Sequence, residues 1–175
     1  LMRLFKKFIL FIIFFLNISF SYGETNIVYL DLDFIFSNSL VGKYINSELE
    51  KQHKQNLENF KKEEKALKDE EIKIISQRNI LKNDEFEKKI NELRNKVNLY
   101  RKHRQASINN LNQLRIDSTN KILQVVNPIL TEYSKKNSIS MIVQKKYIVI
   151  GKSELNITQN ILDQLNIKIK KIELK

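Results

Sequence analysis

The chain has 175 residues, a formal net charge of +11 and no cysteine. The absence of cysteine excludes disulfide staples, thiolate catalysis, iron–sulfur clusters and cysteine-ligated zinc. Its two histidines lie far apart in the sequence and argue against a histidine-rich metal site, so we expect no metal and no cofactor. The length is that of a single domain.

The first segment resembles an export signal. Residues 1–23 carry the basic residues Arg3, Lys6 and Lys7, continue with an apolar block from Phe8 to Phe20, and end with the small residues Ser21 and Gly23. This layout is typical of a secretory signal peptide. The apolar block is short for a membrane span, which needs about 20 residues. We therefore predict cleavage after Gly23, with an uncleaved anchor as the alternative.

The next segment, Ile27 to Leu30, is a short apolar run that predicts a strand. Asp31 and Asp33 follow it and resemble the Asp-x-Asp of haloacid-dehalogenase-like phosphatases, in which one carboxylate attacks phosphorus. No alternating strand–helix pattern follows, and such an enzyme needs one. We interpret Asp33 as a helix cap instead and expect no catalytic residue and no enzyme activity.

A long charged region comes next. No glycine or proline occurs between Gly42 and Pro128, apolar residues are sparse there, and good helix formers dominate. Apolar residues recur every seven positions in its first half, at Phe60, Leu67, Ile74 and Leu81. Steps of four and three mark its second half, at Phe86, Ile90, Leu93, Val97 and Tyr100. Both patterns predict helices that pack along a heptad seam.

The two registers do not join. Leu81 to Phe86 is a step of five, and Asp84 with Glu87 in that region reads as an N-cap and its capping box. We predict an antiparallel helical hairpin with arms near 43–80 and 84–127. One continuous helix in a parallel coiled coil is the alternative.

The C-terminal part returns to a mixed pattern. Pro128 predicts a kink where the second arm ends. The apolar runs 139–143 and 147–150, separated by two lysines, predict a β-hairpin, although the turn lacks the favoured glycine. Residues 158–165 predict a final helix. The alternating run after Asn166 has no assigned role.

The two ends of the chain are richer in apolar residues than its middle, so they can form a core. The predicted fold class is α+β: a small β-rich body from residues 24–42 and 128–175 carries the helical arm 43–127. We expect several chains to share the body core, because pairing removes exposed strand edges. The candidate oligomerisation residues are Ile27, Tyr29, Ile142, Val143, Ile148 and Ile150.

The charge is unevenly spread. Residues 93–116 contain six basic residues and no Asp or Glu. The candidate contacts in this stretch are Arg94, Lys96, Arg101, Lys102 and Arg104. Such a surface attracts acidic polypeptides or the anionic headgroups of a membrane. A solvated helix face without a partner is the alternative.

Several segments resemble, in order and spacing, the Skp/OmpH family of periplasmic chaperones. They are Ile27-Val28-Tyr29-Leu30-Asp31, Ser39-Leu40-Val41-Gly42-Lys43, Val126-Asn127-Pro128-Ile129, Ser138-Ile139-Ser140-Met141-Ile142-Val143 and Leu155-Asn156-Ile157-Thr158, with the breaker-free region between the second and third. The run after Asn166 departs from the family by extending beyond its usual end.

The resemblance implies a homotrimer with a barrel-like body and three helical hairpins around a cavity. It implies a periplasmic holdase that needs no ATP and keeps unfolded outer-membrane proteins soluble before insertion. An anionic membrane surface or lipopolysaccharide is a further expected partner. Nucleic acid is not, because export argues against it and no reading motif is present. A structural coiled-coil adaptor of the cell envelope is the alternative function.

Overall fold

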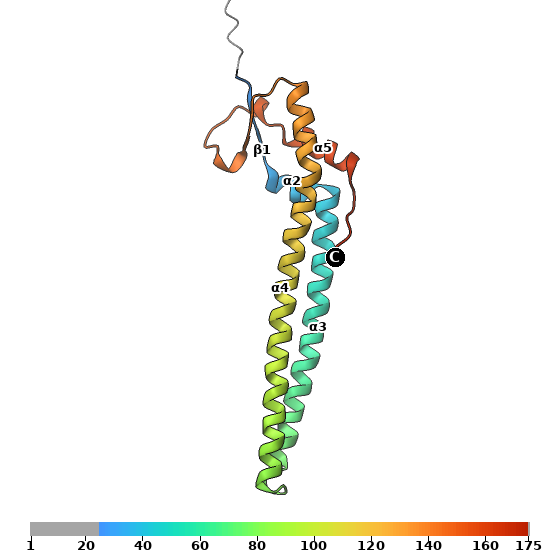
Figure 1. Cartoon of the computed structure of the whole chain (residues 1–175), viewed down its shortest axis with the longest axis vertical. Helices are drawn as coiled ribbons and strands as arrows, with labels where there is room; N and C mark the ends of the chain where they lie inside the picture. Colours follow the sequence, from blue (N-terminus) through green and yellow to red (C-terminus); the bar gives the residue numbers. More distant parts are fainter. Residues whose placement is uncertain (1–24, 175) are drawn as a thin grey trace, which may run out of the picture.

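The computed structural model describes residues 25–174, so the predicted signal peptide lies outside the described residues. Two long helices project side by side from a small body at one end of the molecule (Figure 1). The body combines residues from both ends of the described chain, with a hydrophobic core that includes Val28 near the start and Leu165 near the end.

The body contains one small sheet. Strand β1 (Ile27–Leu30) pairs in parallel with β2 (Met141–Gln144), with Val28 opposite Ile142 and Tyr29 opposite Val143. Parallel strands need a long crossover connection, and here the crossover includes both projecting helices. Val28 and Leu30 point into the core, because successive side chains of a strand alternate between its faces.

The predicted β-hairpin over 139–150 is wrong. Residues Lys145–Tyr147 form a short 3-10 turn, residues 148–152 have no strand structure, and a second 3-10 turn spans Ser153–Leu155. The physical reason is that β2 pairs with β1, and no glycine supports a tight turn after it. Among residues 25–174 the sheet has two strands, so the body is less β-rich than predicted.

Two helices follow β1 with a sharp turn between them. Helix α2 (Leu32–Asn38) is capped by Asp31, not by Asp33 as predicted, since the Asp31 carboxylate accepts a hydrogen bond from the Phe34 amide. Ser39 then caps helix α3 (Leu40–Ser76) by accepting from the Gly42 amide. A Cβ on residue 42 would stand 1.7 Å from the Phe36 carbonyl oxygen, so the turn requires glycine.

The projecting helices are α3 and α4 (Asn83–Lys136), which run in opposite directions and which we call the arm (Figure 1). The chain reverses over residues 77–82, a few residues earlier than the register break predicts. Asp84 is not the N-cap: the cap position is Lys82, which makes no side-chain bond, and Asp84 lies in the first turn.

Helix α4 does not end near residue 127. It continues through Pro128 to Lys136, with the exposed Pro128 inside it. Its last turns enter the body, where Ile122, Val126 and Ile129 are buried against the core. Helix α5 (Thr158–Lys168) contributes Ile161 and Leu165 to the same core. Much of the body is therefore helical.

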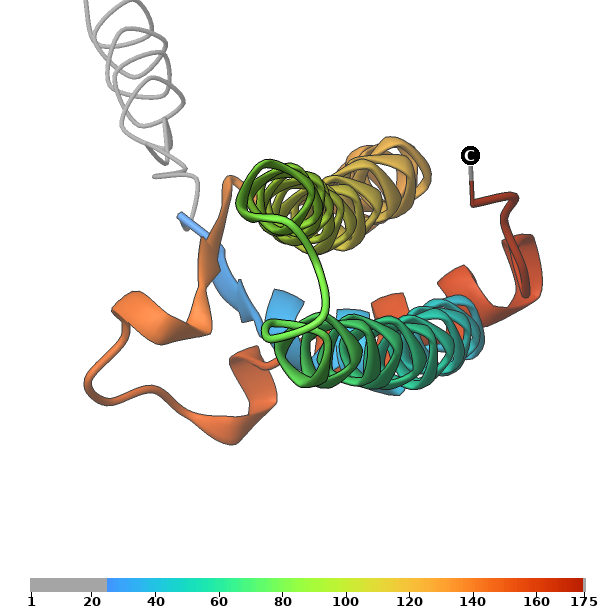
Figure 2. The ribbon, with the colours of Figure 1, turned by 90° about the horizontal axis from the view of Figure 1, so that it is seen from below.

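The run after Asn166 packs against the base of the arm. Ile169, Ile172 and Leu174 lie on the hydrophobic core, and Lys121 of α4 donates a hydrogen bond to the backbone carbonyl of Glu173 over 2.8 Å. We call residues 169–174 the tail. Seen along the arm, the tail lies on one side of the two helices and the segment 145–155 on the other (Figure 2).

Candidate functional site

The arm carries the features expected of a binding surface. Its two helices meet along a thin seam in which Phe60, Ile74 and Leu93 are buried. Phe60 packs edge-on against Tyr100, with 6.1 Å between the ring centroids, and against His103 at 5.6 Å. Few large side chains fill the seam, so grooves remain open beside it.

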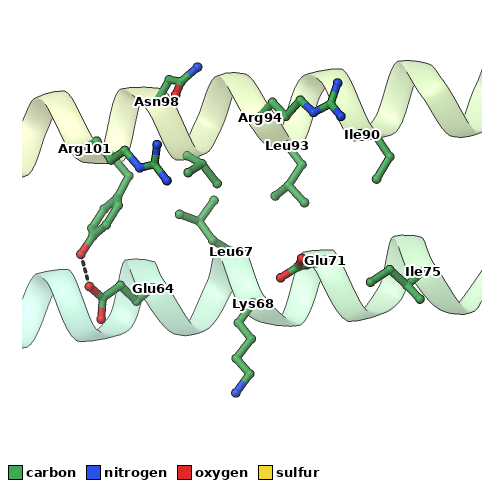
Figure 3. A pocket seen from close by; sticks show the side chains of 12 residues that line it. Glu64, Leu67, Lys68, Glu71, Ile75, Ile90, Leu93, Arg94, Asn98 and Arg101 are labelled. Carbon is green, nitrogen blue, oxygen red and sulfur yellow. Dashed lines mark hydrogen bonds between the residues drawn. The ribbon is translucent and has the colours of Figure 1, made fainter.

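The larger groove has a volume of about 980 Å³ and lies between α3 and α4 (Figure 3). Leu67, Leu93 and Val97 supply apolar surface inside it, while Arg94 and Arg101 line its α4 wall. The remaining lining residues are Glu64, Lys68, Glu71, Ile75, Ile90, Asn98 and Tyr100. The groove therefore offers an apolar surface with cationic groups along one edge.

A second groove of about 440 Å³ lies nearer the body on the same side of the arm. Its lining residues are Asn46, Leu49, Glu50, His53, Ile108, Leu111, Asn112 and Arg115. Arg94, Arg101, Ile108 and Arg115 are spaced by seven and form a line along α4, because seven residues make nearly two helical turns. We call the two grooves and this line the arginine side.

The opposite side of the arm has a different electrostatic character. Lys96 binds Glu70 through contacts of 2.6 and 2.8 Å, and His103 Nδ1 lies 3.5 Å from Glu63. Lys121 lies eighteen residues, about five turns, beyond His103 and so shares its face of α4. Because Lys121 contacts the tail, this is the tail side, and the arginine side opens toward the 145–155 segment (Figure 2).

One hydrogen-bond cluster closes the seam between the two sides. The Tyr100 hydroxyl donates to Glu64, which also accepts from Arg104 Nη1 at 3.3 Å. Burial raises the pKa of the Tyr100 hydroxyl, and the bond to Glu64 raises it further. Tyr100 therefore stays protonated at neutral pH and acts as a hydrogen-bond donor within the arm.

The five predicted basic contacts separate into two groups. Lys96 and Arg104 are neutralised by Glu70 and Glu64 within the arm. Arg94, Arg101 and Lys102 form no ion pair with an acidic side chain of the described residues, although Arg94 donates to Asn91 over 3.2 Å. Sequence reasoning missed Arg115 as a groove residue, and the signal for it was its spacing of fourteen residues from Arg101 and twenty-one from Arg94, both multiples of seven.

The predicted oligomerisation residues lie in the body but not in one cluster. Ile142 packs against the chain's own core. Ile27 is 44% exposed, and the outward-facing Tyr29 and Val143 are half-buried neighbours in the sheet. Ile148 lies near Tyr29, since both approach the Cβ position of residue 151, at 3.4 and 3.1 Å. Ile150 is 93% exposed.

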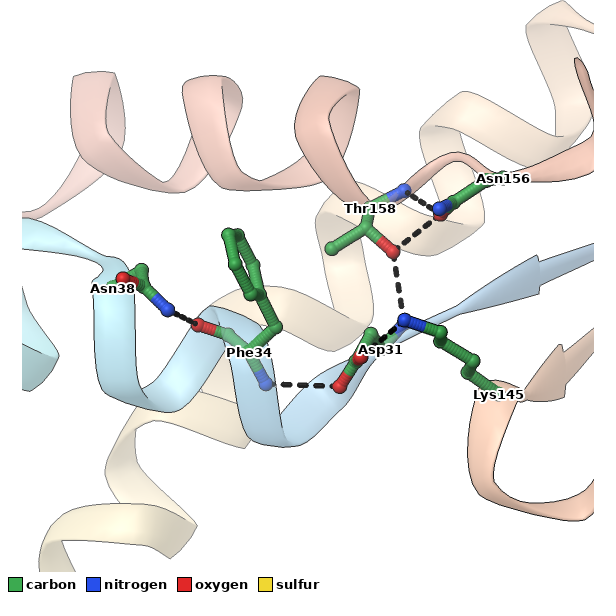
Figure 4. Close-up of polar contacts among 6 residues, drawn as sticks. All are labelled: Asp31, Phe34, Asn38, Lys145, Asn156 and Thr158. Atoms are coloured by element: carbon green, nitrogen blue, oxygen red, sulfur yellow. Dashed lines mark hydrogen bonds and ion pairs between the residues drawn. The ribbon is translucent and has the colours of Figure 1, made fainter. Parts of the chain in front are cut away.

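A polar network beside β1 accounts for the Asp-x-Asp segment (Figure 4). The Asp31 carboxylate accepts from the Phe34 amide at 2.9 Å and from Lys145 Nζ at 3.1 Å, and both contacts lower its pKa. The Asp31 amide donates to the Thr158 hydroxyl, which donates to Asn156. The network joins segments of the body that are far apart in the sequence, and Asp31 therefore has a structural role.

No group of three or more His, Asp or Glu side chains in residues 25–174 is placed to hold a metal ion. Over the same residues, every helix is too short or too polar to cross a membrane.

Comparison with known proteins places these features in context. A family described as "Outer membrane protein (OmpH-like)" matches residues 26–165. A crystal structure described as "a putative outer membrane chaperone (OmpH-like) from Caulobacter crescentus CB15" superposes with a TM-score of 0.79. The two chains are 16% identical over 89% of this chain and 92% of that one, so they share a fold. No curated protein sequence matches the chain significantly.

Proposed function

The chain belongs to the OmpH-like family, and from this premise we propose that it is an ATP-independent holdase chaperone of the periplasm. It binds unfolded outer-membrane proteins in a cavity between helical arms and keeps them soluble until they insert into the membrane. The match over residues 26–165 supports this proposal, because it includes both the arm and most of the body.

The exposed apolar surface of the arm is the observation that carries the proposal. Ile75 is 57% exposed and Ile108 is 44% exposed, although both lie on long paired helices and line the grooves of the arginine side. These side chains add little to the stability of the arm itself, since they remain in contact with water. They suit weak, distributed contacts with an unfolded chain, and the surrounding charged residues keep the free protein soluble.

Assembly of three chains would enclose that surface. The body exposes Ile27 and Ile150, and one edge of β2 pairs with no strand of residues 25–174, so this edge can pair with another chain. The arginine side is opposite the tail side, and Figure 2 shows that the 145–155 segment, which contains Ile150, lies across the two helices from the tail. A homotrimer joined through the body would thus turn the three arginine sides toward a common space.

The unpaired cations supply long-range attraction. Arg94, Arg101 and Lys102 draw in acidic client segments, whereas Lys96 and Arg104 contribute less because acids of α3 already neutralise them. The same surface attracts anionic headgroups of a membrane or of lipopolysaccharide. Residues 1–23 would direct export to the periplasm.

An aggregation assay tests the function. Urea-denatured outer-membrane β-barrel protein is diluted into buffer with or without the chain lacking residues 1–23, and light scattering is followed. We expect suppression near a stoichiometric ratio, with slower capture as salt rises. An unrelated soluble protein of similar charge is the control. Aggregation as fast as in the control, at low and moderate salt, would instead favour a structural adaptor with a fixed partner.

A further inference from the structure

The charges along the arginine side do not cancel. Its α3 wall holds three acids, but Glu64 is paired with Arg104 and Glu50 with Lys54 at 2.7 Å. Among the lining residues of the two grooves this leaves Glu71 against four cations, Arg94, Arg101 and Lys68 in the larger groove and Arg115 in the second, so the grooves have a cationic excess. A carboxylate-bearing ligand is the complement of this surface.

The dimensions of the arginine side suit an extended chain. Arg94 and Arg115 are twenty-one residues apart on α4, which corresponds to about 30 Å along the helix. An extended polypeptide covers that length with about ten residues. Leu67, Leu93 and Val97 lie recessed between the helices, where side chains can reach them but the flat surface of a bilayer cannot.

We propose that the arginine side is a docking groove for acidic, extended segments of an unfolded polypeptide, with Arg94, Arg101 and Arg115 binding carboxylates and the apolar surface beside them binding intervening side chains. This inference rests on the proposed holdase function and names the segments that the arm selects. The tail side is not part of the groove, since its basic residues Lys96 and Lys121 already have partners within the chain.

Two triple variants with the same loss of charge test the proposal. One is Arg94→Gln, Arg101→Gln, Arg115→Gln. The control is Lys51→Gln, Lys62→Gln, Lys88→Gln, whose three lysines are exposed and lie on the helix faces turned away from the seam. Both variants should keep the fold, because every substituted residue is exposed.

The ligands are two synthetic unstructured peptides, identical except that the glutamates of one are glutamines in the other. We expect the wild-type chain to prefer the glutamate peptide. The arginine variant should bind it about tenfold more weakly and lose the preference, since three partly exposed charge contacts are removed. The lysine variant should keep the preference and lose less than threefold. Fluorescence anisotropy at several salt concentrations measures the affinities of all three proteins for both peptides.

Three outcomes would overturn the proposal: equal binding of both peptides by wild type, equal losses in the two variants, or arginine-dependent binding that occurs only to vesicles of anionic phospholipid. The aggregation assay separates these failures from failure of the holdase function. If wild type and both variants suppress aggregation equally, the chain is a holdase whose groove assignment is wrong. If wild type does not suppress aggregation, the holdase function itself fails.

Discussion

Phe60 of α3 and Tyr100 of α4 form an edge-on aromatic pair, with ring centroids 6.1 Å apart, that joins the two helices of the arm. Phe60 is one of the few buried side chains in the arm, where most neighbouring positions are polar. A helix with so thin a seam depends strongly on each packed residue, because isolated helices are marginally stable in water.

Phe60→Ala should therefore loosen the arm without unfolding the body. We expect a loss of about 3 kcal/mol in the local stability of the arm, the size typical of removing a buried phenylalanine. Hydrogen exchange measures it, with faster exchange along α3 and α4 and unchanged exchange in the buried part of α5. Leu57→Ala, at a position 40% exposed, is the control and should change exchange little. Uniform acceleration throughout the chain would contradict the separation of arm and body.

Removal of the tail should weaken the base of the arm. A chain ending at Lys168 lacks Ile169, Ile172 and Leu174, which pack on the core, and the contact from Lys121. Burial of three half-exposed apolar side chains is worth about 2–3 kcal/mol, so the denaturant midpoint should fall accordingly. Lys170→Gln in the full chain, at an exposed position, should leave the midpoint unchanged. An unaltered midpoint after truncation would mean that the contacts of the tail contribute nothing to the stability of the chain.

Asp31 gives the body a pH-dependent stability. Its pKa is lowered by the Phe34 amide and by Lys145, so its stabilising effect is present above the ordinary value of 3.8 and is lost as pH falls through the folded-state value. Asp31→Asn keeps a capping oxygen but removes the charge. Asp31→Ala removes the capping oxygen as well, so its free energy of unfolding should be about 1 kcal/mol lower than that of Asp31→Asn. The difference in free energy of unfolding between wild type and Asp31→Asn should become smaller as the pH falls below the ordinary pKa of aspartate.

Urea titrations at a series of pH values, from neutral to below the ordinary pKa of aspartate, would measure this effect. Asp33→Asn is the matched control, because Asp33 is exposed and caps no helix. An Asp33 variant with the same pH dependence as the Asp31 variant would count against the role of the network.

Ile150→Asp should separate assembly from folding. Ile150 is 93% exposed in the single chain, so the change should leave the protomer folded. If this residue is buried between protomers, an unpaired carboxylate there costs several kcal/mol and the trimer dissociates. Light scattering coupled to gel filtration reports the mass. Ile167→Asp, at a position 82% exposed on α5, is the control. A trimer that survives the Ile150 change would place the interface elsewhere.

Local patterns in the sequence predicted the helices better than the sheet. The recurrence of Phe60 and Ile74 is a property of one helix, and both side chains are buried. The pairing of Tyr29 with Val143 joins residues from opposite ends of the described chain, so no local pattern could reveal it. The strand predicted over the apolar run 147–150 is wrong for a similar reason, because a short apolar run indicates a strand without showing whether a partner strand is present.

Which basic residues of the arm form ion pairs could not be predicted from the sequence, because the acidic partners lie on the neighbouring helix. Lys96 and Arg101 are equivalent in a list of basic residues, yet only Lys96 meets an acid of the neighbouring helix. That difference follows from the pairing of α3 with α4. By contrast, the spacing of Arg94, Arg101 and Arg115 was visible from the start and became meaningful once the grooves beside α4 were known.

The passage of α4 through Pro128 has a mechanical consequence. One uninterrupted helix of 54 residues, about 80 Å long, reaches from the far turn of the arm into the hydrophobic core. A continuous helix is stiff. A lateral force at the far turn of the arm is therefore transmitted to Ile129 and its neighbours in the core, and no hinge between arm and body takes it up. If the chain assembles and encloses clients as proposed, accommodation of clients of different sizes would require bending of this helix or rotation of whole protomers about the body.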